Sequence, residues 1–388
     1  MAAARLLRLP FALLLLLLLQ QQQRAVLADA PAAAAAPTAA LVIGSHEFLG
    51  KAVAHDLAQG KLYDTVYLLD DFQRERLVAP WEVYAGVGVL PGYTPTPELS
   101  ADGVPVFRCD RNLECFSEIL TSRTWDLVVD LTWTDTPGAG DDVDASFLEK
   151  FSGVVSHYVL VSSAAVYGSC SAGGAGLAES YGRRDECENE ASAPWRALEA
   201  PLWRDTKGAK LKWTVVRVPD VMGEMEPKRS LVPFLQVFQN AANGKPLALP
   251  ARLPGGKSSP FSLAHVTDVA EAVVAIATLA TTGQGGSVYG EAFNIASSTT
   301  ITLEGLVSDL KTVTGNAFQT IWREQNDCPF PTVRLFSPLD TSKATSALSG
   351  AWSPSDIGAW LPGLVEWSDP TKNTWYRCAV FEPVLSRF

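Results

Sequence analysis

A short apolar run that ends in two hydroxyls carries the clearest chemical signal in this sequence. Residues Tyr158 to Val161 are apolar, and Ser162 and Ser163 follow them directly. Such a run predicts a strand buried on both faces of a parallel sheet, and ligands bind at the carboxyl ends of these strands. Ser163 is therefore a candidate to contact a ligand. The alternative is a core strand with a serine-rich exit.

Two glycines after the first apolar run predict a second site. Residues 41–43 lead into the segment from Gly44 to Gly50. Gly44 and Gly50 take the first and third places of a dinucleotide-binding turn, where they permit the tight turn and the packing of helix on strand. Glu47 stands where the middle glycine is expected, so its carboxylate would lie beside a diphosphate.

An acidic residue follows the second apolar run at a suitable distance. Asp70 ends this run and lies twenty residues beyond Gly50. An acid at this place in a dinucleotide fold accepts the 2′-hydroxyl of the adenosine ribose, which favours NAD over NADP. A strand-ending Asp is also a common cap or turn residue, so the pattern predicts the fold and leaves cofactor occupancy open.

These residues must be positioned by a regular alternation of strand and helix patterns. A helix is predicted over residues 48–59, and strands over 41–43, 66–69, 104–107, 127–129, 158–161 and 213–216. The alternation predicts a Rossmann-type α/β fold, a doubly wound and mostly parallel sheet covered on both faces by helices. The segment that holds Pro91, Pro95 and Pro97 is predicted to be a long connection.

Two parts are predicted for this fold. Residues 41–217, with a return segment near 262–297, form the Rossmann dinucleotide-binding domain. The segments 218–261 and 298–388 form a smaller C-terminal α/β substrate lobe. The substrate cleft is expected between the two parts.

Further motifs occur in the order of a known superfamily. They are Cys109-Asp110-Arg111, Leu131-Thr132, Arg217 to Gly223, Phe261 to Ala270, Phe293-Asn294-Ile295 and Asp340 to Ala344. With the Ser163 strand and the glycine turn, they resemble the extended short-chain dehydrogenase/reductase superfamily, the NAD-dependent epimerase/dehydratase group, over about residues 41–365. The resemblance implies that Ser163 holds the reacting oxygen of the substrate, and that the substrate is a nucleotide-linked sugar.

The same resemblance implies a set of residues that bind NAD, with NADP less favoured. Asp110 corresponds to the residue that contacts adenine, and Leu131 and Thr132 lie where the group has small residues over the cofactor. The full set is Gly44, Phe48, Leu49, Gly50, Asp70, Asp110, Arg111, Leu131, Thr132, Val161 and Pro219. No cluster of cysteines and histidines suggests a metal site.

The catalytic pair of this group departs from its usual form. The group uses Tyr-x-x-x-Lys on the helix after the serine strand, where the Lys lowers the pKa of the Tyr that moves a proton. In this chain Ala193 and Ala197 occupy the two positions. Arg196 is adjacent but points about 100° away on a helix. Tyr181, in the preceding Gly-rich loop, is the nearby candidate acid or base. The alternative, which the loop composition favours, is a surface role for Tyr181.

Two functions are therefore expected as alternatives. The first is an NAD-binding, epimerase/dehydratase-like enzyme, and the second is a catalytically silent Rossmann scaffold, sensor or binding protein. In lacking the middle glycine and the Tyr-Lys pair, the chain also resembles the plastid stem-loop RNA-binding branch of the superfamily. The net charge of -11 argues against RNA binding, because an acidic surface repels phosphates.

The first thirty residues have the layout of a secretory signal peptide. Arg5 and Arg8 precede the apolar run from Leu9 to Leu19, and Ala28 to Ala30 form a small-x-small cleavage site. The run is shorter than the about 20 residues that span a bilayer, so no stable membrane span is expected after cleavage. The alternative is an uncleaved anchor. Residues 31–40 would be an Ala/Pro linker. The expected location is the secretory lumen or the extracellular space, or a plastid reached through that route.

Six cysteines follow this segment, which permits disulfides in a translocated chain. Cys170 and Cys187 flank a polar loop and are the pair most expected to form a bridge. The alternative is six free thiols in a reducing organelle. A homodimer is one expected assembly.

Overall fold

Eight strands form one sheet in the computed structural model, which describes residues 38–44, 48–70, 94–99, 105–109, 114–131, 151–170, 176–204, 211–223, 246–250, 260–315, 319–323 and 337–367. Their order across the sheet is β11-β7-β6-β5-β1-β2-β4-β3. The strands are β1 (Ala39–Ile43), β2 (Thr65–Asp70), β3 (Thr94–Leu99), β4 (Pro105–Arg108), β5 (Leu127–Asp130), β6 (His157–Ser163), β7 (Lys212–Val218) and β11 (Glu291–Asn294).

The strand order reverses beside β1, which pairs with β2 on one side and with β5 on the other. All neighbouring pairs are parallel except β3 with β4, which is antiparallel. In an open parallel sheet, the point of reversal opens a crevice at the carboxyl ends of the strands, and ligands bind there. A ligand is therefore expected at the carboxyl ends of β1, β2, β5 and β6.

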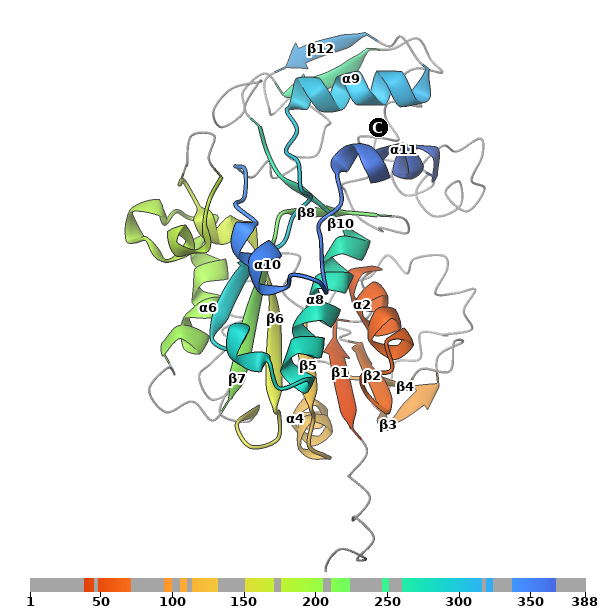
Figure 1. The fold of residues 1–388 in the computed structure, drawn as a ribbon, viewed down its shortest axis with the longest axis vertical. Helices are drawn as coiled ribbons and strands as arrows, with labels where there is room; N and C mark the ends of the chain where they lie inside the picture. Colours follow the sequence, from red (N-terminus) through yellow and green to blue (C-terminus); the bar gives the residue numbers. More distant parts are fainter. Residues whose placement is uncertain are drawn as a thin grey trace, which may run out of the picture. The chain divides into compact units, whose positions relative to one another are not determined.

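Helices cover both faces of the sheet (Figure 1). They are α2 (Phe48–Gln59), α4 (Glu114–Thr121), α6 (Ala193–Arg204) and α8 (Val266–Thr281). Successive side chains of a strand point to opposite faces. Accordingly, Val42 packs with residues of α2 and α8, whereas Ile43 belongs to the apolar cluster that includes residues of α4 and α6.

The part of the chain after β7 adds two small parallel sheets and three further helices. The first sheet pairs β8 (Asp220–Met222) with β10 (Leu263–His265), and the second pairs β9 (Leu247–Pro250) with β12 (Thr320–Arg323). The helices are α9 (Leu303–Thr314), α10 (Ser342–Ala347) and α11 (Ile357–Trp367). Thr302 caps the start of α9 by accepting a hydrogen bond from the Gly305 N–H, and Gly315 ends that helix at φ 64°.

The predicted fold class is confirmed: the sheet is doubly wound, mostly parallel and covered by helices. One local prediction is wrong. The proline-rich segment was expected to be a connection, but Thr94–Leu99 forms β3 at the sheet edge. Proline cannot donate to a ladder and is therefore tolerated on edge strands, which explains Pro95 and Pro97 in β3.

By its internal contacts the chain divides into Met1–Pro37 and a second compact unit, Thr38–Phe388. The predicted signal peptide and most of the linker lie in the first unit, outside the described residues. Across the described helices, none combines the length and the apolar character that a membrane span requires.

Candidate functional site

The turn that leaves β1 has the backbone geometry that the glycine pattern predicts. Gly44 has φ 87°, in the left-handed region that favours glycine. Its N–H donates to the Leu69 carbonyl oxygen at 3.0 Å, and the Leu131 N–H donates to the Ile43 carbonyl oxygen at 3.0 Å. These bonds hold the ends of β1, β2 and β5 together at the carboxyl-terminal side of the sheet.

Helix α2 starts three residues beyond Ser45, and its N-terminus follows this turn. Free N–H groups at a helix N-terminus attract phosphates. Leu49 is buried in the core with Val53, so a contact between Leu49 and a cofactor would involve its backbone. Gly50 is also buried. Phe48 begins α2, but its side chain is outside the described part, as are residues 45–47.

The other predicted cofactor residues divide into three groups. Asp70 is the last residue of β2, in register with Arg108 of β4, although its side chain is not among those described. Leu131, Val161 and Pro219 are buried at or near the carboxyl ends of their strands. Asp110, Arg111 and Thr132 lie outside the described residues.

The two serines at the end of β6 point to different surroundings. Ser163 is partly exposed, and its Oγ accepts a hydrogen bond of 3.1 Å from the Ala165 N–H. It thereby caps the short helix η1 (Ala164–Tyr167). A hydroxyl that accepts one bond can still donate its own proton, so Ser163 keeps a donor for a ligand. Ser162 is buried and donates to Glu199 Oε1 at 2.7 Å.

A buried polar network lies next to these serines, and the sequence did not predict it. Arg217 of β7 donates from Nε to Glu199 Oε1 at 3.0 Å and from Nη2 to Glu199 Oε2 at 2.6 Å. Arg217 also donates from Nη1 to the Tyr167 hydroxyl at 3.3 Å. Tyr167 in turn donates to Asn294 Oδ1. The spacing of these residues in the sequence gives no periodic signal, because they come from four separate elements.

The charges of this network are matched despite their burial. Burial lowers the pKa of Arg217, but the adjacent Glu199 carboxylate outweighs this and raises the pKa above its usual value. Burial raises the pKa of Tyr167 to about 12, against the opposing effect of Arg217. Arg217 is therefore a permanent cation, and Tyr167 stays a neutral phenol that donates one hydrogen bond and accepts another.

Residues 176–187, which we call the strap, cross the carboxyl ends of β7 and β11. Arg217 Nη1 donates to the Glu179 carbonyl oxygen at 2.7 Å. The Asn294 N–H donates to Glu179 Oε1 at 2.9 Å, and Asn294 Nδ2 donates to the Leu177 carbonyl oxygen at 2.7 Å. The strap is thus fastened to the buried network at its first half.

The strap carries Tyr181, the predicted acid or base. The ring of Tyr181 is partly buried against the core, and the guanidinium carbon of Arg184 lies 3.9 Å from the ring centroid. Gly182 is packed so closely that a Cβ there would lie 2.5 Å from Arg217 Nη1. Tyr181 therefore belongs to a segment whose path is set by Arg217, rather than to an unattached surface loop.

A disulfide closes the strap at its other end. Cys170 and Cys187 are bonded, with their Cα atoms 4.8 Å apart, so the predicted pairing is confirmed. The Ser169 N–H donates to the Cys187 carbonyl oxygen at 2.9 Å. A second disulfide, Cys109–Cys115, joins the end of β4 to α4 and was not predicted.

Helix α6 contains neither tyrosine nor lysine, in any register. Ala193 starts it, and Ala197 lies one turn later. Arg196 donates from Nε to the Val166 carbonyl oxygen at 2.8 Å and from Nη1 to the Arg184 carbonyl oxygen at 2.9 Å. Arg196 therefore ties η1 to the strap and does not replace the missing lysine.

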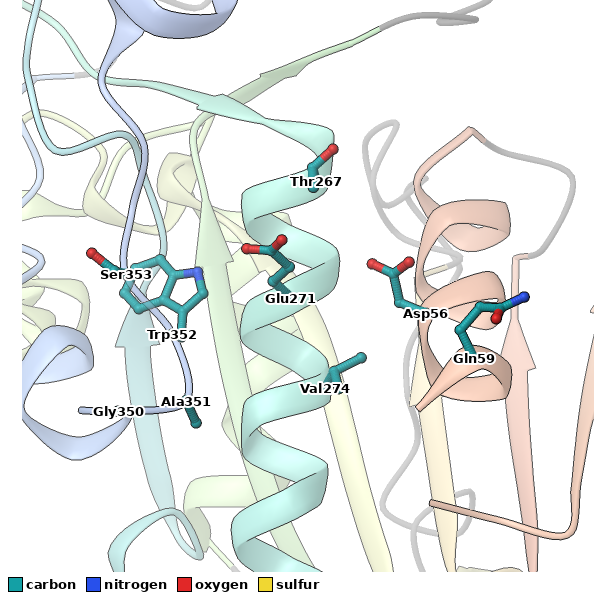
Figure 2. Close-up of a pocket in the computed structure, with 9 residues that line it drawn as sticks. All are labelled: Asp56, Gln59, Thr267, Glu271, Val274, Gly350, Ala351, Trp352 and Ser353. Carbon is teal, nitrogen blue, oxygen red and sulfur yellow. The ribbon is translucent and has the colours of Figure 1, made fainter. Parts of the chain in front are cut away.

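A groove with a volume of about 700 Å³ lies on the outer surface between α2 and α8 (Figure 2). Asp56 of α2 and Glu271 of α8 line facing sides of it. Burial raises the pKa of both carboxyls, and the charges of Asp268 and Asp56 raise that of Glu271 further. None of the predicted site residues lines this groove. Among the described residues, no group of three or more potential ligands could hold a metal.

Comparison with known proteins identifies the fold through structure alone. No family model and no curated protein sequence matches the chain. A UDP-glucose 4-epimerase from Thermotoga maritima, solved with UDP-glucose, aligns with a TM-score of 0.63 and 17% identity over 86% of this chain and 99% of that chain. A dTDP-glucose 4,6-dehydratase from Bacillus anthracis, solved with NAD, gives 0.63 and 17% over 88% and 99%.

A UDP-glucuronic acid 4-epimerase from Bacillus cereus, also solved with NAD, gives a TM-score of 0.63 and 17% identity over 87% and 100%. Nearly the whole of each solved chain is covered, so the likeness includes the parts beyond the dinucleotide-binding half. The resemblance to the RNA-binding branch has no counterpart in these three structures. The chain therefore has the fold of nucleotide-sugar epimerases and dehydratases.

Proposed function

We propose that this chain is an NAD-binding, epimerase/dehydratase-like protein whose substrate is a nucleotide-linked sugar. One observation carries the proposal: a fold shared over most of the chain with such enzymes has, at its point of strand reversal, a glycine turn with φ 87° at Gly44. The three solved relatives are crystallised with UDP-glucose or with NAD, which supports both ligand classes.

The residues at the end of β1 fit an NAD diphosphate. Gly44 allows the backbone to turn sharply toward the start of α2, whose N–H groups would face the phosphates. Asp70 at the end of β2 would accept the ribose 2′-hydroxyl, which favours NAD over NADP. When bound, NAD supplies an acceptor for hydride. Phe48, Asp110, Arg111 and Thr132 remain proposed contacts.

On the substrate side, Ser163 would donate its hydroxyl proton to a sugar oxygen. Its Oγ is fixed by the bond from the Ala165 N–H, which limits its rotation. Tyr181 is the proposed acid or base, because it lies on a strap held by Arg217 and Asn294 at the same edge of the sheet. A group so held could move a proton at a sugar hydroxyl.

The second candidate is a catalytically silent protein that binds the same ligands. Ala193 and Ala197 favour it, because α6 carries neither the tyrosine nor the lysine that related enzymes use for proton transfer. The binding turn and the strap would then serve recognition alone.

Calorimetry and fluorescence together separate these candidates. NAD is titrated first, and UDP-glucose is then titrated into the NAD complex. If the protein is an active enzyme, we expect it to bind both NAD and UDP-glucose and to show a transient rise in reduced-nicotinamide fluorescence. Tyr181→Phe is expected to abolish this rise while both ligands still bind. A silent protein predicts binding of both without any fluorescence change. Failure to bind either ligand contradicts the proposed function.

We also propose that residues 1–30 are removed and that the mature protein lies in an oxidising compartment or reaches a plastid by the secretory route. The charged start and short apolar run support cleavage. The N-terminal mass of the protein purified from its native cell tests this. A measured mass that includes residues 1–30 would contradict the proposed cleavage. A homodimer is proposed on the same footing, with sedimentation as its test.

A further inference from the structure

The strap has little apolar packing of its own. Of its twelve residues, only Leu177, Gly182 and Cys187 are buried, and residues 183–186 are exposed. Segments with few buried contacts are those that open most readily in a native protein. The position of the strap must therefore depend on its specific attachments.

Different attachments hold the two halves of the strap. The first half is held by hydrogen bonds from Arg217 and Asn294, and by a short parallel pairing of Leu177 with Leu339. The second half is held by the Cys170–Cys187 disulfide, by the backbone bond from Ser169, and by Arg196 bound to the Arg184 carbonyl oxygen. Only the disulfide can be removed and restored chemically without a change of sequence.

The two ends of the disulfide differ in exposure. Cys187 is 1% exposed, whereas Cys170 is only partly buried. Cys170 is therefore the more open end of the bridge, at which an incoming thiolate would attack and displace Cys187. The chain around Cys187 is tightly fitted, since Gly168 with φ 55° approaches the Cys187 carbonyl so closely that a Cβ would lie 2.0 Å from the oxygen.

We propose that the Cys170–Cys187 disulfide is a redox switch that controls binding on the substrate side of the site. The inference rests on the proposed function. In the oxidised form, the strap is fixed against η1, the short helix that Ser163 caps, and the nucleotide sugar binds. In the reduced form, the second half of the strap is released and the sugar binds weakly. NAD binding, at the ends of β1 and β2, is unaffected.

The step is a thiol–disulfide exchange with a dithiol reductant. One thiolate of the dithiol attacks Cys170 Sγ, and Cys187 leaves as a thiolate and takes up a proton. The second thiol of the reductant then closes its own disulfide, and Cys170 leaves and is protonated. Two electrons and two protons pass from the dithiol to the protein.

The test compares the oxidised and reduced forms of the full chain. NAD and UDP-glucose affinities are measured by calorimetry before and after treatment with dithiothreitol, and alkylation with mass spectrometry confirms which cysteines have opened. If reduction lowers the fraction of molecules with an ordered strap to about a tenth, the affinity for UDP-glucose falls about tenfold. NAD affinity stays within about twofold, and reoxidation restores the UDP-glucose affinity.

Two variants make the result specific. Cys109→Ser/Cys115→Ser removes the other disulfide, which lies beside β4 on the opposite half of the sheet, and it keeps the full redox response. Cys170→Ser/Cys187→Ser binds UDP-glucose weakly under both conditions. The switch is contradicted if UDP-glucose affinity is unchanged once Cys170 and Cys187 are alkylated, or if the second variant binds like the oxidised protein. If the oxidised protein binds neither ligand, the proposed function itself fails.

Discussion

Arg217 and Glu199 form a two-point ion pair that is closed off from solvent, with exposed side-chain fractions of 0% and 3%. The pair joins β7 to α6, and Arg217 Nη1 fixes the strap through the Glu179 carbonyl oxygen. A charged pair of this kind stabilises the fold only while both partners are present, because either charge alone would be buried and uncompensated.

Loss of one partner is therefore costly. We expect Glu199→Gln to lower the free energy of unfolding by about 3 kcal/mol, since it leaves the Arg217 cation buried without its anion. The control is Glu291→Gln, which breaks the half-exposed pair with Lys343 and costs less than about 1 kcal/mol. Urea unfolding of both variants provides the measurement. Equal losses in the two variants would contradict the assigned role of Arg217.

Gly44 is expected to serve both the fold and the cofactor. Gly44→Ala forces a side chain into the left-handed region and costs about 1–2 kcal/mol, and it also weakens NAD binding. Gly283→Ala is the matched control, because Gly283 has φ 79° with no atom near its Cβ position. Both variants lose stability, but only Gly44→Ala loses NAD affinity in calorimetry. Equal NAD affinity in the two proteins would show that this turn does not bind the diphosphate.

Glu47→Gly tests the same turn from the opposite direction. Glu47 stands at the middle-glycine position of the sequence fingerprint, where a carboxylate would lie beside a diphosphate that favours backbone N–H groups. We expect the glycine variant to bind NAD more tightly in calorimetry. Unchanged affinity would mean that the loop does not run beside the phosphates.

His157 gives the fold a pH dependence. Burial, aided by the charge of Lys212, lowers the pKa of His157 from 6.5 to about 3. Below pH 6.5 the unfolded chain takes up a proton that the folded chain refuses, so stability is complete above pH 6.5 and falls as the pH drops toward 3. At about pH 4.5, this one group is expected to cost roughly 2–3 kcal/mol relative to neutral pH.

His157→Gln is the variant that tests this dependence. His157 Nε2 lies 2.9 Å from Thr214 Oγ1, which itself donates to the Val288 carbonyl oxygen, so a glutamine amide can keep the donor role without titrating. The variant should lose less stability than the parent protein between neutral pH and about pH 4.5. Identical pH profiles for the two proteins would rule out His157 as the source.

The sheet could be predicted from the sequence because its central strands are near-continuous apolar runs. Such runs indicate strands that are buried on both faces. The prediction failed at β3, where Pro95 and Pro97 mask an edge strand. The strands β9 (Leu247–Pro250) and β12 (Thr320–Arg323) of the region after β7 were also missed, since that region shows no regular alternation of strand and helix patterns.

The sequence patterns that point to the candidate site are local ones. Gly44, Ser163 and the Cys170–Cys187 pair follow from the chain on either side of them. The network of Arg217, Glu199, Tyr167 and Asn294 does not, because those residues meet only after four elements have packed. Long-range polar contacts leave no periodic trace in a sequence.

The central claim is that NAD occupies the end of β1. Mass spectrometry of the ligands released from the purified, denatured protein tests it most directly, with the Gly44→Ala variant treated in parallel. We expect NAD in the extract of the parent protein, or its retention after incubation and desalting, and a marked loss from the variant. An extract without NAD, together with no retention after incubation, would contradict it.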